Sequence, residues 1–487
     1  MRTKLYTLKY MLTFAFLVLA GCSDDFVYVD GQDENSEDYF NTPEDYELAL
    51  VGAYDLLQAT YLNVMLGEIA SDNTLAGGES ATDVPGIQEI DDMVHTPVNQ
   101  QLRDIWSWMY AGVNRANYIL EFQDKIDFEG KEEIIAQARF LRAYYYFELV
   151  KWFGDVPLAV DRRIQFGDQF DIPRTPKAEV YSLIEEDLKF AAANLPATQE
   201  EEGRITSGAA QALLGKAYLY QKEFAEAATA FEPVINGPYS LVEDYESIFE
   251  PEGENNEESV FEVQYTDKEG AGFGCLQCSE GNVAVGFNGI RNYTGPKFES
   301  GFSFNVPVQE VVDLFSGDDI RKDVAILDIE AWAEETGATY SEGYEHTGYY
   351  NRKYISRQGD LNTGDANLTN PNNYRAIRLA DVLLMAAEAN LKKPSPDEEK
   401  ARRYLNLVRE RAELDPVTLS EDDLLEQIYE DRRLELVGEG HRFFDLVRTE
   451  RAADEIDGFV SGKHELFPIP AIEIQLAGNN WEQNPGY

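Results

Sequence analysis

Amphipathic helical periodicity in two blocks, separated by a stretch that lacks it, is the feature that most constrains the fold of this chain. From about residue 43, where Pro43 follows a Thr42 cap, to 235, and again from 373 to 487, apolar residues recur at intervals of three and four. This spacing places them on one helix face, and successive stripes favour antiparallel packed helices. Two stripes in the first block are Leu102, Ile105, Trp106, Met109, Tyr110, Val113, Tyr118 and Ile119, and Ile134, Ala138, Leu141, Tyr145 and Leu149. The chain is therefore predicted to be mainly α-helical.

A shorter module within the first block indicates how the helices pair. Residues 207–220 are rich in Ala and Gly, and a second helix with Phe224 and Ala227 is predicted directly after them. This arrangement resembles tetratricopeptide hairpins, in which small residues let two helices approach closely. A frame of tetratricopeptide-like helical hairpins, 43–235 and 373–487, is the expected architecture.

Between residues 236 and 372 the helical period fades, and Gly, Asn and aromatic residues accumulate. Residues 260–265 alternate with a period of two, which predicts a short strand. Because frame residues are committed to packing, a long insertion of this kind is the expected place for function. We therefore expect a single domain, 43–487, whose helical frame carries a variable ligand-binding insertion of irregular loops and short strands.

The first 21 residues have the organisation of a signal peptide. Three basic residues precede an apolar run, 10–19, that is too short for a stable membrane span. Residues 19–22, with the sequence LAGC, resemble a bacterial lipobox, which predicts that Cys22 becomes an acylated N-terminus. An ordinary secreted protein with a cysteine near its cleavage site is the alternative. Residues 22–42 are acidic and poor in apolar residues, so we expect an extended tether there.

The charge balance excludes one class of partner. The chain has 90 acidic and 41 basic residues, a formal net charge of −49, and no basic patch. A field of this sign repels phosphate backbones, so nucleic acid is not an expected partner.

The two remaining cysteines, Cys275 and Cys278, form a lone C-x-x-C. A zinc site would need two further ligands at suitable spacing, and the four histidines are scattered. No metal and no cofactor are therefore expected. In an extracytoplasmic protein a local disulfide is the favoured interpretation, and a pair of free thiols in a loop is the alternative.

Several segments, in order along nearly the whole mature chain, resemble the SusD/RagB family. The most specific is 432–448, RRLELVGEGHRFFDLVR, which matches the family stretch RR-x-E-L-x-x-E-G-x-R-x-x-D-L-x-R. The others are 110–117, 154–158, 375–388, 467–470 and 483–487. One departure is Gly438, where a helix former or an aromatic residue is expected.

The resemblance implies a non-catalytic, glycan-binding lipoprotein on the outer-membrane surface of Bacteroidetes. Such a protein takes part in polysaccharide utilization by passing a captured oligosaccharide to a SusC-like TonB-dependent transporter. Acidic residues directly after Cys22 look like the surface-export signal of such lipoproteins, although their spacing alone is equally compatible with a periplasm-facing anchor. A RagB-like peptide-binding protein is the main alternative, followed by a tetratricopeptide scaffold that binds proteins alone and by a hydrolase.

Charged residues of the 432–448 motif have two interpretations. Arg432 with Glu435, and Glu439 with Arg442, are three residues apart and able to form ion pairs on a helix. The favoured interpretation is a partly buried charge network that ties the C-terminal helices to the frame. A ligand-binding charge cluster is the alternative. A catalytic carboxylate pair cannot be chosen from 90 acidic residues.

A glycan site needs exposed aromatic faces for stacking and planar polar groups for hydrogen bonds. Four of the five tryptophans have structural explanations: Trp106, Trp108, Trp152 and Trp481. This leaves Trp332, in the insertion, as the predicted stacking platform, with core packing as the alternative.

Other candidates are weaker. The resemblance implies that an early loop near Asp72 and Asn73 supplies polar contacts, although a capping or turn role fits equally well. The remaining candidate ligand contacts are Phe287, Asn288, Arg291, Tyr293, Tyr344 and Tyr349. Since an acidic body opposes polyanionic glycans unless cations bridge them, a neutral, laminarin-like glucan is the expected ligand.

Overall fold

The computed structural model describes residues 39–160, 162–165, 167–359, 365 and 367–487. The predicted signal peptide, Cys22 and the tether up to residue 38 lie outside the described residues. Helices dominate the described chain and the strands are short, so the prediction of a mainly α-helical fold is confirmed. None of the described helices is long and apolar enough to cross a membrane.

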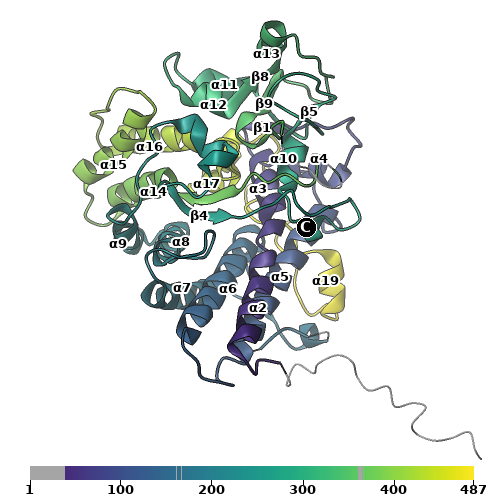
Figure 1. Ribbon diagram of the computed structural model, residues 1–487, viewed down its shortest axis with the longest axis vertical. Helices are drawn as coiled ribbons and strands as arrows, with labels where there is room; N and C mark the ends of the chain where they lie inside the picture. Colours follow the sequence, from purple (N-terminus) through teal and green to yellow (C-terminus); the bar gives the residue numbers. More distant parts are fainter. Residues whose placement is uncertain (1–38, 161, 166, 360–364, 366) are drawn as a thin grey trace, which may run out of the picture.

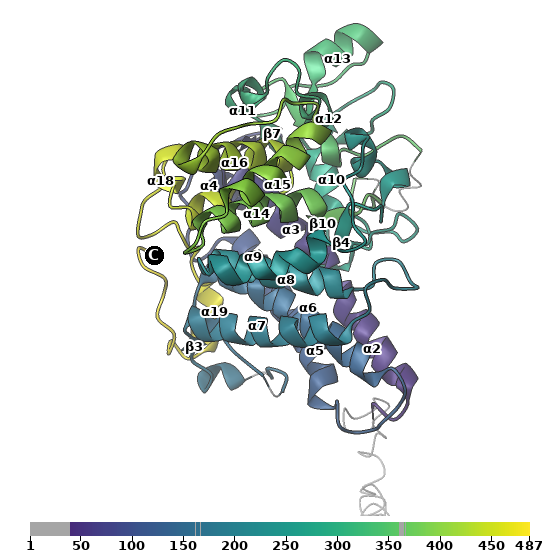
Figure 2. The ribbon, with the colours of Figure 1, turned by 90° about the vertical axis from the view of Figure 1, so that its left-hand side faces the viewer.

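The first block is a set of consecutive helices that pack side by side (Figures 1 and 2). It comprises α2 (Pro43–Asp55), α5 (Gln100–Glu121), α6 (Lys131–Phe153), α7 (Lys177–Asn194), α8 (Ser207–Tyr220) and α9 (Phe224–Ile235), with α3 (Tyr61–Ile69), α4 (Pro85–Asp91), β2 (Val156–Pro157) and β3 (Arg174–Thr175) between them. The start of α2 is as predicted, because Thr42 and Asp45 form a capping box in front of Pro43. Small residues let the helices approach closely, as expected: a Cβ added at Gly215 of α8 would lie 2.4 Å from the Phe231 ring of α9.

The second block docks on the first through contacts between α9 and α14. It comprises α14 (Leu379–Lys392), α15 (Glu398–Arg411), α16 (Glu421–Leu436), α17 (Arg442–Arg448), α18 (Ala452–Glu455) and α19 (Ala471–Leu476). Gly438 follows α16 with a φ of +82°. Only glycine adopts this left-handed conformation without strain, which explains the departure from the family pattern at this position.

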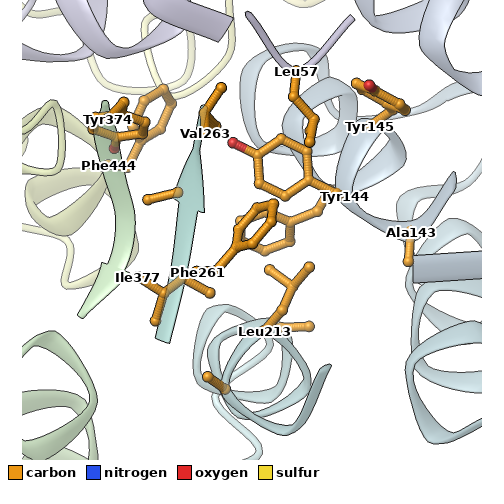
Figure 3. Close-up of a cluster of buried hydrophobic side chains, with 14 of the residues drawn as sticks. Leu57, Ala143, Tyr144, Tyr145, Leu213, Phe261, Val263, Tyr374, Ile377 and Phe444 are labelled. Atoms are coloured by element: carbon orange, nitrogen blue, oxygen red, sulfur yellow. The ribbon is translucent and has the colours of Figure 1, made fainter. Parts of the chain in front are cut away.

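A pair of antiparallel strands joins the two blocks. β4 (Ser259–Val263), which overlaps the predicted strand 260–265, pairs with β10 (Tyr374–Arg378), and Val263 stands opposite Tyr374. Figure 3 shows Phe261 of β4 beside Tyr144 of α6, with Leu213 of α8 below them. The Phe261 and Tyr144 ring centroids are 5.8 Å apart. The main hydrophobic core therefore continues from the frame helices across these two strands.

The insertion is less irregular than predicted, because it contains four short helices besides its strands within the described residues. They are α10 (Val283–Asn288), α11 (Gln309–Leu314), α12 (Arg321–Ala325) and α13 (Ile329–Thr336). β5 (Ile290–Arg291) runs parallel to β6 (Ser300–Gly301), while β7 (Asn305–Pro307) pairs antiparallel with β1 (Thr74–Ala76) and β8 (Ile326–Asp328) with β9 (Tyr349–Asn351). The insertion has a small core of its own, which includes Phe298, Ile329 and Tyr350.

A buried charge network connects the 432–448 motif to the rest of the molecule. The Glu435 carboxylate, which is fully buried, accepts a hydrogen bond of 2.6 Å from Arg378 and pairs with Arg411 and Arg321. Glu439 pairs with Arg378 and, at 2.7 Å, with Lys353. Burial by itself would raise the pKa of Glu435, but Arg411, Arg378 and Arg321 lower it to about 2. The interpretation of these residues as a structural network is confirmed.

The pairing inside the motif differs from the expectation. Arg432 does not bond to Glu435 but to Asp381 of α14 and, at 2.7 Å, to Asp445. Arg442 bonds to Asp72 rather than to Glu439. The reason is geometric: the buried faces of α16 and α17 point to other elements, so each side chain reaches a partner on a neighbouring segment.

Candidate functional site

Three segments that are distant in sequence meet around Arg291, and we call them the Arg291 loop cluster: residues 77–83, 287–304 and 339–345. Backbone hydrogen bonds hold them together, from Gly78 N to Ser303 O (2.7 Å), from Tyr344 N to Gly78 O (2.9 Å) and from Ser341 N to Arg291 O (2.9 Å). The approach is so close that a Cβ added at Gly77 would lie 2.0 Å from the Ser303 carbonyl oxygen. The cluster is therefore a fixed platform rather than a set of independent loops.

The Arg291 guanidinium is the polar centre of this platform. It is half-buried, and it donates to the Phe302 carbonyl oxygen at 2.7 Å and to Ser303 Oγ at 3.1 Å. The Asp83 carboxylate lies 3.7 Å away. Since a guanidinium carries five N–H donors, Arg291 is held in place while it keeps donors for a ligand. The exposed Asn292 amide, which donates to Ser341 Oγ at 3.2 Å, adds a planar polar group beside it.

Aromatic rings continue the platform at Phe302, whose carbonyl oxygen accepts from Arg291. Phe273 is 59% exposed, and its ring centroid lies 5.8 Å from that of the half-buried Phe302. Phe302 in turn packs on Phe287 at 5.6 Å. Cys275 and Cys278 form a disulfide beside Phe273, which confirms the favoured interpretation of the C-x-x-C.

Sequence reasoning missed Phe273 and Phe302. The signal for Phe273 is local, because a phenylalanine between glycines, in the segment 270–274, is poorly suited to a core. Phe302 gives no comparable signal, since its exposure depends on the loops that surround it.

Trp332, the predicted platform, lies on α13 and is half-buried. Its Nε1 donates to Tyr293 Oη at 2.9 Å, and its ring packs 5.3 Å from Phe298 in the small core of the insertion. The structure brings Trp332 and Tyr293 together as a pair. Its role in stacking stays a prediction.

Three of the other candidates lie inside the protein. Tyr293 is 7% exposed, and its hydroxyl is engaged by Trp332 and Pro296. Phe287 and Asn288 are 7% and 3% exposed on α10. The Asn288 side chain faces the interior and donates to the Tyr354 carbonyl oxygen. The expectation of direct ligand contact is therefore wrong for Asn288.

The two tyrosine candidates lie in different places. Tyr344 is half-buried within the Arg291 loop cluster, and the neighbouring Glu345 carboxylate, through a hydrogen bond, raises the pKa of its phenol. Tyr349 lies on β9, where its hydroxyl donates to Gln309 of α11 at 2.9 Å. Of the two, only Tyr344 belongs to the cluster.

Asp72 and Asn73 have structural roles. The Asp72 carboxylate forms two hydrogen bonds of 2.7 and 2.8 Å with Arg442 and an ion pair of 2.9 Å with Arg433. Asn73 is fully buried, donates to Glu68 and accepts from Arg433. The expectation of ligand contact is wrong for Asn73 because no part of it reaches the surface, and the two arginines of the C-terminal motif engage the Asp72 carboxylate.

The arrangement has the chemistry of a binding surface. Rings of Phe273 and Phe302 suit the C–H faces of a sugar, and the guanidinium and amide groups beside them suit its hydroxyl groups. In the described part of the chain, no group of three or more His, Cys, Asp or Glu side chains is arranged to hold a metal ion.

Two family models together match most of the chain. The model of the SusD family matches residues 246–487, and a second model, described as starch-binding associating with outer membrane, matches residues 28–219. SusD-like protein P2 of Formosa agariphila is 29% identical, over 98% of this chain and 100% of that protein.

Solved structures of similar proteins superpose on most of the chain. A laminarin binding SusD-like protein superposes with a TM-score of 0.84 at 35% identity, over 92% of this chain and 100% of that chain. Surface glycan-binding protein A from Bacteroides thetaiotaomicron, in complex with laminarihexaose, superposes with a TM-score of 0.80 at 27% identity, over 91% and 100% of the two chains.

Proposed function

The chain belongs to the SusD/RagB family of glycan-binding proteins, and we propose that it captures a neutral, laminarin-like glucan at the Arg291 loop cluster and delivers it to a SusC-like TonB-dependent transporter. The family associates with the outer membrane. Acylation of Cys22 would anchor the chain there on its acidic tether, with the single domain 43–487 exposed at the cell surface. In this role the protein binds and transfers its ligand without catalysis.

The observation that carries the proposal is that Phe302, whose carbonyl oxygen accepts from the Arg291 guanidinium, packs its half-buried ring near the exposed ring of Phe273. A guanidinium held by two protein acceptors and a pair of packed rings would give a sugar a preformed surface, so little ordering would accompany binding. Arg291, Tyr344 and Trp332 are the sequence-based candidates that we retain for direct contact.

The choice of glycan rests on charge and on relatives. A body with a formal net charge of −49 repels anionic polysaccharides. Two of the similar structures are named for laminarin and laminarihexaose, which are neutral β-glucans.

Isothermal titration with laminarihexaose tests the site. Replacing Arg291 by alanine removes charged hydrogen-bond donors, and we expect an affinity loss of about tenfold or more. Phe273→Ala should weaken binding through the lost stacking surface. Leu48→Ala is the matched control, because Leu48 is an apolar side chain on α2 that is 64% exposed.

Unchanged affinity in both Arg291→Ala and Phe273→Ala would remove the cluster from the binding site. Binding of peptides or of anionic polysaccharides alone would refute the choice of ligand. Release of reducing ends from bound laminarin would refute the non-catalytic role, and a Cys22→Ala protein that stays in the membrane fraction would refute the lipid anchor.

A further inference from the structure

A pocket lies between α5, residues 164–165 and 167–172, and the C-terminal segment that includes α19. Its volume is about 280 Å³, near the lower end of the range of small-ligand sites. Figure 2 places α19 and α10 on opposite sides of the ribbon, so this pocket is remote from the Arg291 loop cluster. We call it the α5–α19 pocket.

Aromatic rings line one wall of the pocket. Trp106 lies 5.0 Å from Tyr110 and 6.1 Å from Trp481, measured between ring centroids. The Tyr110 hydroxyl donates to the Pro157 carbonyl oxygen at 2.8 Å, and Trp481 Nε1 donates to Ile172 O at 2.9 Å. These hydrogen bonds fix the rings, so the apolar wall is preformed.

The opposite rim of the pocket is held by hydrogen bonds to Asn114 and Trp481, which also line the pocket. Asn114 of α5 both donates to Ile164 O at 2.9 Å and accepts from Ile164 N at 2.8 Å. At the other end of the rim, Ile172 receives the hydrogen bond from Trp481. Ile164 and Ile172 are therefore both tied to the pocket wall.

Polar side chains of the pocket keep bonding capacity. The Glu473 carboxyl group, which is half-buried, forms no hydrogen bond or ion pair within the described chain. Burial raises its pKa, and the charge of Arg103 only partly offsets this effect. Gln169 accepts from Gly167 N at 2.9 Å through Oε1, which leaves its amide N–H groups available, and Ser107 adds a hydroxyl group.

We propose that the α5–α19 pocket binds a sugar unit of a neutral oligosaccharide, as a second carbohydrate site. This inference rests on the proposed function. A carboxylate accepts several hydroxyl protons, the Gln169 amide donates to hydroxyl oxygens, and the aromatic wall contacts C–H groups. An anionic sugar would be repelled by Glu473, while a simple cation would leave the amide donors of Gln169 unused. One long glucan that reaches both sites would be held more tightly than by either site alone.

Stoichiometry in titrations with laminarihexaose tests the proposal. The wild-type protein should bind two molecules per chain, and Arg291→Ala should retain only the α5–α19 pocket. The double variant Glu473→Ala/Gln169→Ala should retain only the Arg291 site, with that site's affinity unchanged. Gln475→Ala is the matched control, because Gln475 is an exposed amide on the same helix, α19.

The possible results separate the two sites. A wild-type stoichiometry of one that is lost in Arg291→Ala and unaffected by the Glu473→Ala/Gln169→Ala change would overturn the second site and leave the proposed function intact. Binding that is lost only in the Glu473→Ala/Gln169→Ala protein would instead support the pocket and refute the Arg291 site. Absence of binding by the folded wild-type protein would overturn both.

Discussion

Replacing Glu435 by glutamine tests whether the buried charge network holds the molecule together. Glutamine keeps the shape of the side chain but removes the negative charge that Arg378, Arg411 and Arg321 share. Uncompensated charge left in the interior by removal of one partner costs about 3–5 kcal/mol. We therefore expect a large loss of stability with no change in the surface of the protein.

The magnitude can be converted into a change in melting temperature. With an unfolding entropy of about 2.1 cal/mol/K per residue, the roughly 440 described residues give about 0.9 kcal/mol/K. A loss of about 3–5 kcal/mol then lowers Tm by about 3–5 °C, which differential scanning calorimetry resolves.

Glu426→Gln is the matched control on the same helix. Glu426 pairs with Arg451 at 3.1 Å, but its side chain is 63% exposed. Exposed pairs contribute about 0–1 kcal/mol, so Tm should fall by about 1 °C or less. If Glu435→Gln melts within about 1 °C of this control, the network contributes no net stabilisation and the reasoning is refuted.

Three further predictions concern stability. The pKa of Glu435 and that of Asp445 are both about 2, so between pH 4.5 and 2 the unfolded chain takes up protons that the folded chain does not. Tm should therefore be stable above about pH 5 and fall steadily below it. A Tm that stays constant down to pH 3 would contradict the assigned pairing. Gly440→Ala should destabilise the folded protein by at least about 1–3 kcal/mol, because Gly440 has a φ of +80° and an added Cβ would lie 2.5 Å from the Val64 carbonyl oxygen. An unchanged midpoint of urea unfolding would contradict this prediction. Asp72→Asn should lower Tm, since two arginines lose their counter-charge, while the affinity for laminarihexaose stays unchanged; a loss of affinity without a loss of Tm would restore Asp72 as a ligand contact.

Much of the frame could be predicted because its determinants are local. The α2 cap at Thr42, the small face of α8 and the disulfide of Cys275 with Cys278 each depend on residues within a few positions of one another. The helices of the insertion were harder to predict, since α10 to α13 are five to eight residues long and too short to show a clear period.

Binding residues were less predictable because exposure depends on distant segments. Asn73 is covered by Arg433, which lies 360 positions away in the chain, and nothing near Asn73 in sequence indicates this. Arg291 and Tyr344 were predicted separately as ligand contacts in the insertion, and nothing in the sequence indicates that they lie in one cluster. That Gly78 of the frame lies between them follows from the pairing of β1 with β7, a long-range contact.

The pairing of β4 with β10 has a consequence for how ligand specificity diversifies. Val263 and Tyr374 stand opposite each other, so the chain from 264 to 373 leaves and re-enters the frame at one point. A segment with this topology can be exchanged as a cassette, because the length of the segment can change without moving the frame helices. The frame nevertheless depends on the charges of the cassette, since Arg321 and Lys353 of the cassette pair with Glu435 and Glu439 of the frame. A transplanted cassette must bring its own two cations to these positions, or the frame that receives it will be left with buried, unneutralised carboxylates.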